Sequence, residues 1–143
     1  MRVLACVLVA VVVLLATISA ASAGEIELAV IVHPSRATSL TREAVKRIYL
    51  KRQRFWEDGD EIVVINQEVA TPARQTFTRL VFGDEAARLP AYWNQEYFQG
   101  VLPPIILGSE EAVVRYVASR PDAIGYVDAR KVDASVATAL LLR

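Results

Sequence analysis

The residues of this chain best suited to bind a ligand lie around Thr71 and Arg74. An apolar run that ends at Ile65 leads through a polar loop to Thr71-Pro72, a pair typical of a helix N-cap followed by proline in the first turn. The first N–H groups of a helix have no partner within the helix, and they attract anions. With the Thr71 hydroxyl, the Arg74 guanidinium and Gln67 close by, the pattern predicts an oxyanion site.

The same loop also contains a group that opposes an anion. Glu68 precedes the expected helix start, where its carboxylate would repel an oxyanion or occupy the site itself. An ordinary capped helix that binds nothing is therefore an alternative interpretation of the pattern.

Other polar residues suit structural roles. His33 follows an apolar run, at a place where open α/β sheets bring ligands, but a loop-capping imidazole is the simpler interpretation. The pairs Asp58 with Asp60 and Glu110 with Glu111 lie beside turn or helix-start signals. We interpret them as solvated or capping groups rather than as catalytic carboxylates.

Catalysis and metal binding find little support in the sequence. Cys6 is the only cysteine and His33 is the only histidine, so a cysteine-rich metal site cannot be built. No nucleophile, base and orienting residue can be named together. We expect a protein that is not an enzyme and that holds no cofactor and no metal.

Charge and composition argue against nucleic acid as a partner. The 143 residues are 54% hydrophobic, and 16 basic side chains balance 16 acidic ones. A neutral chain lacks the general attraction to phosphates that nucleic-acid-binding proteins use. Five cations cluster at the end of one expected helix, where a solvated face explains them better than an acidic partner: Lys46, Arg47, Lys51, Arg52 and Arg54.

The N-terminus has the organisation of a secretory signal. Arg2 precedes an apolar run from Val3 to Ile18, and the small residues that signal peptidase accepts follow at 21–23. This predicts a signal peptide at 1–23 and one exported, periplasmic domain at 24–143, without Cys6. An uncleaved anchor is the alternative, because the apolar stretch is long enough to cross a bilayer.

Strand and helix patterns alternate along the remaining chain. Strands are expected at 25–32, 61–66, 123–127 and 136–142, a short extended piece at 103–107, and helices after Thr41, after Thr71, through 92–98 and after Ser109. Short loops between such elements require crossover connections. The fold class is therefore α/β, with a largely parallel sheet flanked by helices.

The expected core follows from the apolar runs and the inward helical positions. Its residues are Ile31, Ile48, Tyr49, Val64, Ile65, Phe77, Leu80, Val113, Val117, Ile124 and Val127. Four aromatic side chains are also expected in the core rather than on a sugar-stacking surface: Trp56, Trp93, Tyr97 and Phe98.

Several of these segments resemble one lobe of the phosphate-binding receptors of bacterial ABC importers. The most specific pieces are Ile48-Tyr49-Leu50 followed by Trp56, and residues 121–127, Pro-Asp-Ala-Ile-Gly-Tyr-Val, which match the family's Pro-Gly-Ala-Ile-Gly-Tyr-Val. The resemblance spans residues 26–128. It implies a single periplasmic-binding-protein-like lobe of type II, export to the periplasm, and capture of phosphate or a related oxyanion.

The chain also departs from that family. The receptors close two lobes over the ion, whereas this chain has the length of one. Where the family carries Arg-x-Asp-Gly-Ser-Gly-Thr before the helix, residues 67–73 read Gln-Glu-Val-Ala-Thr-Pro-Ala. The arginine and the aspartate are absent, and only Thr71 keeps a hydroxyl in register.

Two functions remain open at this point. As a solute-binding component, the protein would hold phosphate or another oxyanion for the membrane subunits of an ABC importer. As an interaction module, it would have kept the lobe, lost ligand binding, and would contact another periplasmic protein through its basic helix end or its open cleft face.

Overall fold

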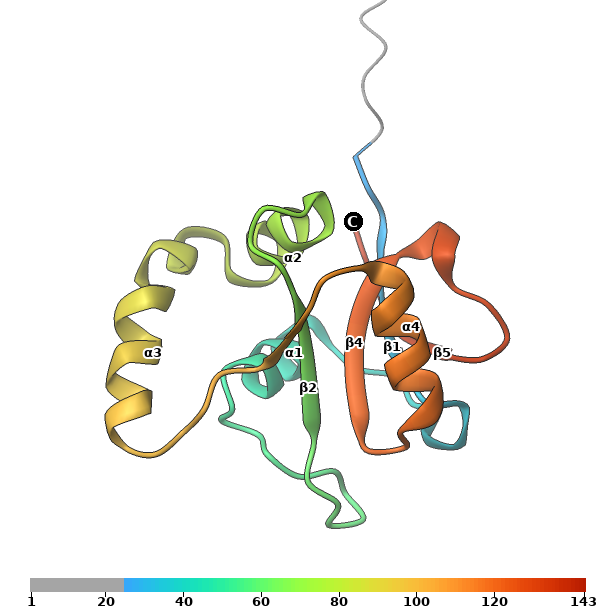
Figure 1. The fold of residues 1–143 in the computed structure, drawn as a ribbon, viewed down its shortest axis with the longest axis horizontal. Helices are drawn as coiled ribbons and strands as arrows, with labels where there is room; N and C mark the ends of the chain where they lie inside the picture. Colours follow the sequence, from blue (N-terminus) through green and yellow to red (C-terminus); the bar gives the residue numbers. More distant parts are fainter. Residues whose placement is uncertain (1–24) are drawn as a thin grey trace, which may run out of the picture.

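The computed structural model describes residues 25–143, which form a five-stranded sheet with helices on both faces (Figure 1). The predicted signal peptide, residues 1–23, lies outside the described residues, as does Cys6. Within 25–143, no helix is both long enough and apolar enough to cross a membrane.

The sheet has the strand order β3-β2-β4-β1-β5. Its strands are β1 (Leu28–Val32), β2 (Val63–Gln67), β3 (Ile105–Leu107), β4 (Ala123–Asp128) and β5 (Ala137–Leu142). Strand β2 is parallel to β3 and β4, whereas β1 is antiparallel to β4 and to β5. The other four strands thus point one way, which confirms a largely parallel α/β sheet, and β1 runs against them.

Within residues 25–143, four helices and three short 3-10 turns connect the strands. They are η1 (Pro34–Arg36), α1 (Arg42–Tyr49), α2 (Pro72–Phe82), η2 (Gly83–Arg88), α3 (Leu89–Phe98), α4 (Glu110–Ser119) and η3 (Ala129–Lys131). The expected caps are present: Thr41, Thr71 and Ser109 each accept a hydrogen bond from the N–H three residues later. These caps explain why the helices α1, α2 and α4 begin where the sequence predicted.

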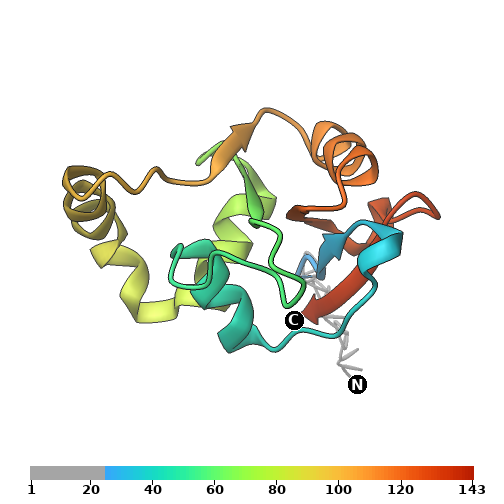
Figure 2. The same cartoon turned by 90° about the horizontal axis from the view of Figure 1, so that it is seen from below.

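The helices bury the two faces of the sheet in separate clusters. Helices α1 and α2 cover one face, through residues such as Ile48 and Phe77, and α4 covers the other with Val113 and Val117 (Figure 2). Every residue of the expected core is buried except Leu80, which is half-buried at the margin of the first cluster.

Gly125 in β4 allows α4 to lie close to the sheet. A Cβ atom at this position would be 2.6 Å from Val113 Cγ1 and 3.3 Å from Val117 Cγ2, so even alanine would force the helix outward. The next residue, Tyr126, points to the opposite face and stacks on Phe77 with ring centroids 3.9 Å apart. The Ile-Gly-Tyr motif therefore lets β4 pack against α4 on one face, through Gly125, and against α2 on the other, through Tyr126.

The prediction that the aromatic residues of α3 belong to the core is wrong for Tyr97 and Phe98, which are 63% and 82% exposed. Only the first half of α3 is anchored, by Leu89 and by Tyr92, whose hydroxyl donates to the Leu50 carbonyl oxygen (2.6 Å). The second half of the helix projects away from the sheet (Figure 1). Helical spacing revealed the helix but not what it packs against.

Candidate anion site at the start of helix α2

The loop from β2 to α2 builds its own helix cap. Thr71 has extended backbone angles, and its Oγ1 accepts from the Arg74 N–H (3.2 Å) and donates to the Glu68 carbonyl oxygen (2.9 Å). Pro72 occupies the first turn, as predicted. The Thr71 hydroxyl thus already serves the protein itself.

Few backbone donors remain at this helix start. Pro72 has no N–H, and the Arg74 N–H is held by Thr71, so Ala73 is the first-turn residue of α2 whose N–H meets no acceptor among residues 25–143. No acidic residue lies in the first turn. The carboxylate of Glu68 is exposed and makes no hydrogen bond or ion pair within the described chain. Glu68 therefore does not occupy the start of α2 through a hydrogen bond, although its charge lies nearby.

Arg74 is the group at this site with the most unused capacity. Its Nη1 donates to the Gln67 carbonyl oxygen (2.7 Å), which anchors the guanidinium beside the end of β2. The side chain is half-buried, yet no carboxylate of residues 25–143 pairs with it. A guanidinium has five N–H donors, and most of those of Arg74 have no acceptor in the described chain. A half-buried guanidinium without a carboxylate partner is available to an anionic ligand.

Gln67 contributes to the site through its backbone and not through its amide. Its side chain is 1% exposed, and Nε2 donates to the Tyr126 carbonyl oxygen (2.8 Å), while Oε1 has no partner in the described chain. Alternation along β2 puts Gln67 on the face of Ile65, under α4, away from Arg74. The structure therefore brings together Thr71, Arg74 and the carbonyl group of Gln67, but not its amide.

A narrow hollow lies beside Arg74, between α2 and the segment that carries α3. Its polar lining comes from Asn66, Arg74 and Thr78, and Phe77 and Trp93 are among its walls. We call this feature the Arg74 hollow. It offers about 20 Å³ of space accessible to water, room for about one water molecule.

Asn66 and Thr78 add free donors to the Arg74 hollow. The Oδ1 of Asn66 accepts from the Gln67 N–H (2.9 Å) and from the Tyr126 hydroxyl, so its Nδ2 is left without an acceptor in the described chain. The Thr78 hydroxyl has no hydrogen-bond partner there either. Three side chains with available donors thus face one small space.

Buried phenols line the floor of this region and stay neutral. Burial raises the pKa of Tyr49 and of Tyr126 well above the usual range, and the positive charge of Arg74 only partly offsets that effect. Tyr49 donates its proton to the Ile65 carbonyl oxygen (2.9 Å). No negative phenolate therefore competes with an anion for Arg74 near neutral pH.

The sequence reasoning missed Asn66 and Thr78. For Thr78 a signal existed, because residues four apart on a helix share one face, and Thr78 is four residues after Arg74. For Asn66 the signal was strand alternation: it faces opposite to Gln67, so the two could not both serve one site.

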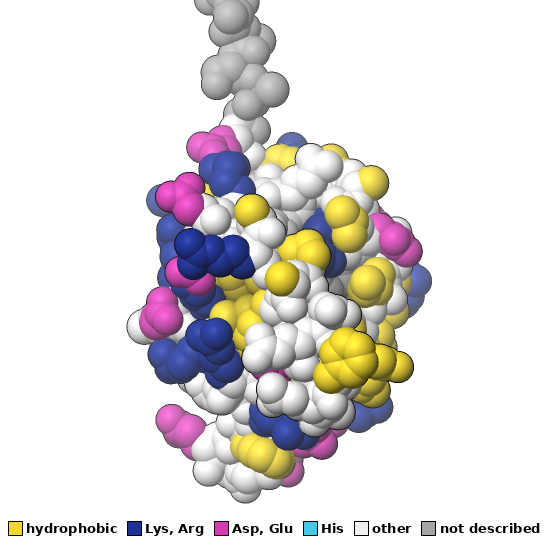
Figure 3. All heavy atoms as spheres, turned by 90° about the vertical axis from the view of Figure 1, so that its left-hand side faces the viewer, with side chains coloured by type: hydrophobic (Ala, Val, Ile, Leu, Met, Phe, Trp, Pro, Cys, Tyr) yellow, Lys and Arg dark blue, Asp and Glu magenta, His cyan; other side chains and the backbone are white. Residues whose placement is uncertain are grey.

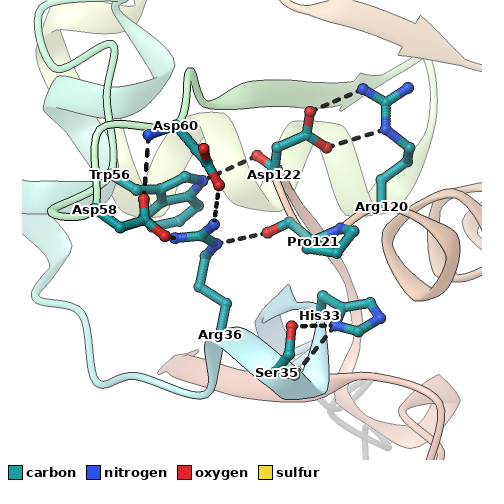
Figure 4. Close-up of polar contacts among 9 residues, drawn as sticks. All are labelled: His33, Ser35, Arg36, Trp56, Asp58, Asp60, Arg120, Pro121 and Asp122. Atoms are coloured by element: carbon teal, nitrogen blue, oxygen red, sulfur yellow. Dashed lines mark hydrogen bonds and ion pairs between the residues drawn. The ribbon is translucent and has the colours of Figure 1, made fainter.

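The opposite end of the sheet holds a second arginine with very different surroundings (Figure 4). Arg36 donates from Nε to the Pro121 carbonyl oxygen (2.6 Å), and its two other nitrogens pair with Asp58 and Asp60, both at 2.9 Å. Its guanidinium carbon lies 5.0 Å from the ring centroid of Trp56. We call these five residues the Arg36 cluster.

The Arg36 cluster joins three segments that are distant in sequence. Arg36 belongs to η1, Trp56 to the loop before β2, and Pro121 to the turn before β4; the Trp56 Nε1 also donates to the Asp122 carbonyl oxygen (3.0 Å). Beside it, His33 caps η1 by accepting from the Ser35 N–H (3.1 Å), which confirms the loop-capping interpretation. Asp58 and Asp60 are likewise structural.

The positive end of the α4 dipole is neutralised by acidic residues of α4 itself. Glu110 and Glu111 lie in its first turn, where the helix dipole favours them. Glu110 accepts from the Asp128 N–H (2.6 Å) and pairs with Lys131 (2.9 Å). Within 25–143, no group of three His, Asp or Glu side chains lies close enough together to hold a metal ion.

No family model matches this sequence, and no curated protein matches it. Solved structures match its fold. An ABC-type phosphate transport receptor from Vibrio cholerae superposes with a TM-score of 0.62 and 20% identity, over 79% of this chain and 46% of that chain. A putative phosphate ABC transporter substrate-binding protein from Clostridium perfringens, solved with bound phosphate, gives 0.61 and 23%, over 80% and 45%. PstS from Borrelia burgdorferi gives 0.54 and 19%, over 71% and 41%.

The chain thus has the fold of phosphate ABC transporter substrate-binding proteins, as the sequence resemblance predicted. It spans less than half the length of each of these structures. The likeness covers one α/β lobe.

Proposed function

We propose that this protein is an exported, phosphate-binding-protein-like component that binds phosphate or a related oxyanion at Arg74 and serves an ABC importer. The observation that carries the proposal is the half-buried Arg74 guanidinium, which is anchored by the Gln67 carbonyl group and lacks a carboxylate partner in the described chain. An oxyanion would supply the missing counter-charge through charge-assisted hydrogen bonds.

The other residues would have distinct roles. Thr71 holds the start of α2 in place, and the Ala73 N–H and the helix dipole attract negative charge. Asn66 Nδ2 and the Thr78 hydroxyl would donate from the Arg74 hollow. Because the hollow admits about one water molecule, the ion would sit at its mouth, against the guanidinium.

Export and the absence of catalysis belong to the same proposal. The N-terminal pattern of a basic residue, an apolar run and small residues supports cleavage and a periplasmic location. The solved structures that share the fold are transport receptors by their descriptions, which supports a role in solute capture. A protein with one lobe would leave the ion partly hydrated, so we expect weak binding unless a second chain covers it.

Isothermal titration of the exported protein with phosphate and with sulfate tests this function. We expect heat of binding that saturates below millimolar ligand, and about fivefold weaker binding, close to 1 kcal/mol, in Arg74→Ala and in Thr71→Val. Arg79→Ala is the matched control, because Arg79 lies on the same helix but is exposed and pairs with Glu25 (2.6 Å). Silence up to millimolar ligand, or equal losses in Arg79→Ala and Arg74→Ala, would contradict the proposal.

Two further variants distinguish the Arg74 hollow from the helix start. Asn66→Asp keeps the acceptor for the Tyr126 hydroxyl but replaces the Nδ2 donor by negative charge, and Thr78→Val removes a hydroxyl at constant shape. If the ion meets the hollow, both variants weaken binding. If only Thr71→Val and Arg74→Ala do so, the ion binds at the helix start alone.

A second candidate function is the interaction module, and one observation favours it. The second half of α3 and the edge strand β3 expose large apolar side chains, among them Phe98 at 82%. Such a surface is typical of a contact with another protein. This function would remain if titration with phosphate and sulfate gave no heat.

A further inference from the structure

The chain exposes a group of large apolar side chains, close together in sequence, that the proposed anion binding does not use. It consists of Tyr97, Phe98, Leu102, Ile105 and Ile106, which are 45–82% exposed and follow the end of α3, the linker and β3. We call it the α3–β3 surface. Figure 3 shows the side of the molecule on which α3 lies, where apolar side chains form several separate groups with charged side chains around them.

The backbone of β3 is also unpartnered on its outer side. Strand β3 stands at the edge of the sheet and pairs only with β2 among the described residues. Exposed edge strands are normally protected by charged side chains, bulges, prolines or short length, because their free N–H and C=O groups pair with other strands. Strand β3 has only three residues and follows Pro103-Pro104. Here residues 97–109 contain no charged side chain at all.

We propose that the α3–β3 surface is the interface of a symmetric homodimer, in which β3 pairs antiparallel with β3 of a second copy. In a two-fold contact each surface meets itself, so a charged surface would repel its copy and an uncharged one does not. Antiparallel pairing of the two β3 strands joins the two sheets and satisfies the free edge of each copy. The proposal goes beyond anion binding and does not depend on it.

The size of the surface fits this occupant. Five large side chains at these exposures present on the order of 600 Å² per copy, near the area that each partner contributes to a stable interface. The border of the α3–β3 surface contains both positive and negative side chains. Lys51, Arg54 and Glu61 lie there, beside Leu102 and Ile105. A rim of mixed charge does not select an anionic membrane or an acidic protein over a second copy.

Sedimentation of the exported protein at about 100 µM tests the association. We expect the mass of two copies, and at least tenfold weaker association in Phe98→Asp and in Ile106→Lys. Leu141→Lys is the matched control, because Leu141 is 45% exposed on β5, the other edge strand. A monomeric parent protein would overturn the proposal, and so would a dimer that Leu141→Lys disrupts while Phe98→Asp and Ile106→Lys leave it intact.

A cysteine at the centre of β3 tests the geometry without relying on weakened association. In a two-fold antiparallel pair of this three-residue strand, Ile106 lies opposite Ile106 of the second copy, at a separation that a disulfide can bridge. The described chain contains no other cysteine. We expect mild oxidation to cross-link Ile106→Cys into dimers but not Leu141→Cys. Equal cross-linking of both variants, or of neither, would contradict the β3–β3 pairing.

Discussion

Arg36 and Arg74 stand at opposite ends of the same sheet, and both are shielded from solvent. Arg36 has two carboxylates, a carbonyl oxygen and an indole ring around it. Arg74 has one carbonyl oxygen and no carboxylate in the described chain. The difference separates an arginine that holds the fold together from one that is available to a ligand.

The two ends also differ in what their carboxylates do. At the Arg36 end, Asp58 and Asp60 neutralise the guanidinium, so an added anion would be repelled. At the Arg74 end, Glu68 is exposed and unpaired within the described chain. A partly buried arginine therefore indicates an anion site only when no carboxylate of the protein already pairs with it.

The largest effect should come from Phe77, which lies between the two ends. Phe77→Ala removes a fully buried ring that stacks on Tyr126 and touches Tyr49, and it should lower the free energy of unfolding by about 3 to 5 kcal/mol. Urea unfolding followed by circular dichroism measures it. Leu80→Ala, at a half-buried position of the same helix, is the control and should lose less. An unchanged urea midpoint for Phe77→Ala would mean that α2 is packed differently.

The second prediction compares the two arginines directly. Arg36→Ala should lower the free energy of unfolding by about 2 kcal/mol, through loss of the Pro121 hydrogen bond and the Trp56 contact, while the exposed aspartates contribute little. Arg74→Ala should lower it by less than about 1 kcal/mol, because one hydrogen bond is lost. Urea unfolding of both variants measures these losses. A larger loss in Arg74→Ala than in Arg36→Ala would contradict the assignment of Arg36 to the fold and Arg74 to a ligand.

The third prediction concerns acid. The Asp60 N–H, with help from Arg36, lowers the pKa of Asp58; Arg120 lowers that of Asp122, and Arg130 that of Asp128. On acidification the unfolded chain takes up protons at these groups before the folded chain does, so stability is full well above pH 3.8 and is lost as the pH falls through the lowered pKa values. The melting temperature should be level from pH 8 to 5 and should drop below pH 4.

The smallest effect should come from Glu68. Glu68→Gln removes a negative charge near the α2 start and should strengthen oxyanion binding by about 1 kcal/mol or less, because the side chain is exposed. Titration with sulfate measures it. Glu43→Gln, in the first turn of α1, is the control and should have no effect on binding. Weaker binding in Glu68→Gln would place the ion elsewhere.

Much of the fold could be predicted from local patterns. Thr71-Pro72 and Ser109 with its two glutamates specify helix starts through contacts within four residues, and the apolar runs specify buried strands. The reversed direction of β1 could not be predicted, because β1 pairs with strands about 100 residues away. The prediction that Tyr97 and Phe98 lie in the core is wrong because helical spacing does not show what a helix packs against.

The site could be predicted only in part. The helix start and Arg74 follow from sequence, since both depend on neighbours along the chain. The buried amide of Gln67 could not be placed, because its partner is the carbonyl oxygen of Tyr126 on another strand. The free donors of Asn66 likewise depend on the Tyr126 hydroxyl, which occupies Oδ1.

The position of β1 bears on how the chain folds over time. Leu28 pairs with Asp128 on one side and with Leu142 on the other, so β1 has no neighbour in the sheet until residues about 100 positions later have been synthesised. Contacts between such distant residues form slowly, because a long loop must close first. We propose that this protein is exported, and a chain that crosses a membrane before it folds benefits from that delay. The sheet can close only after β4 and β5 have been synthesised, which leaves time for export.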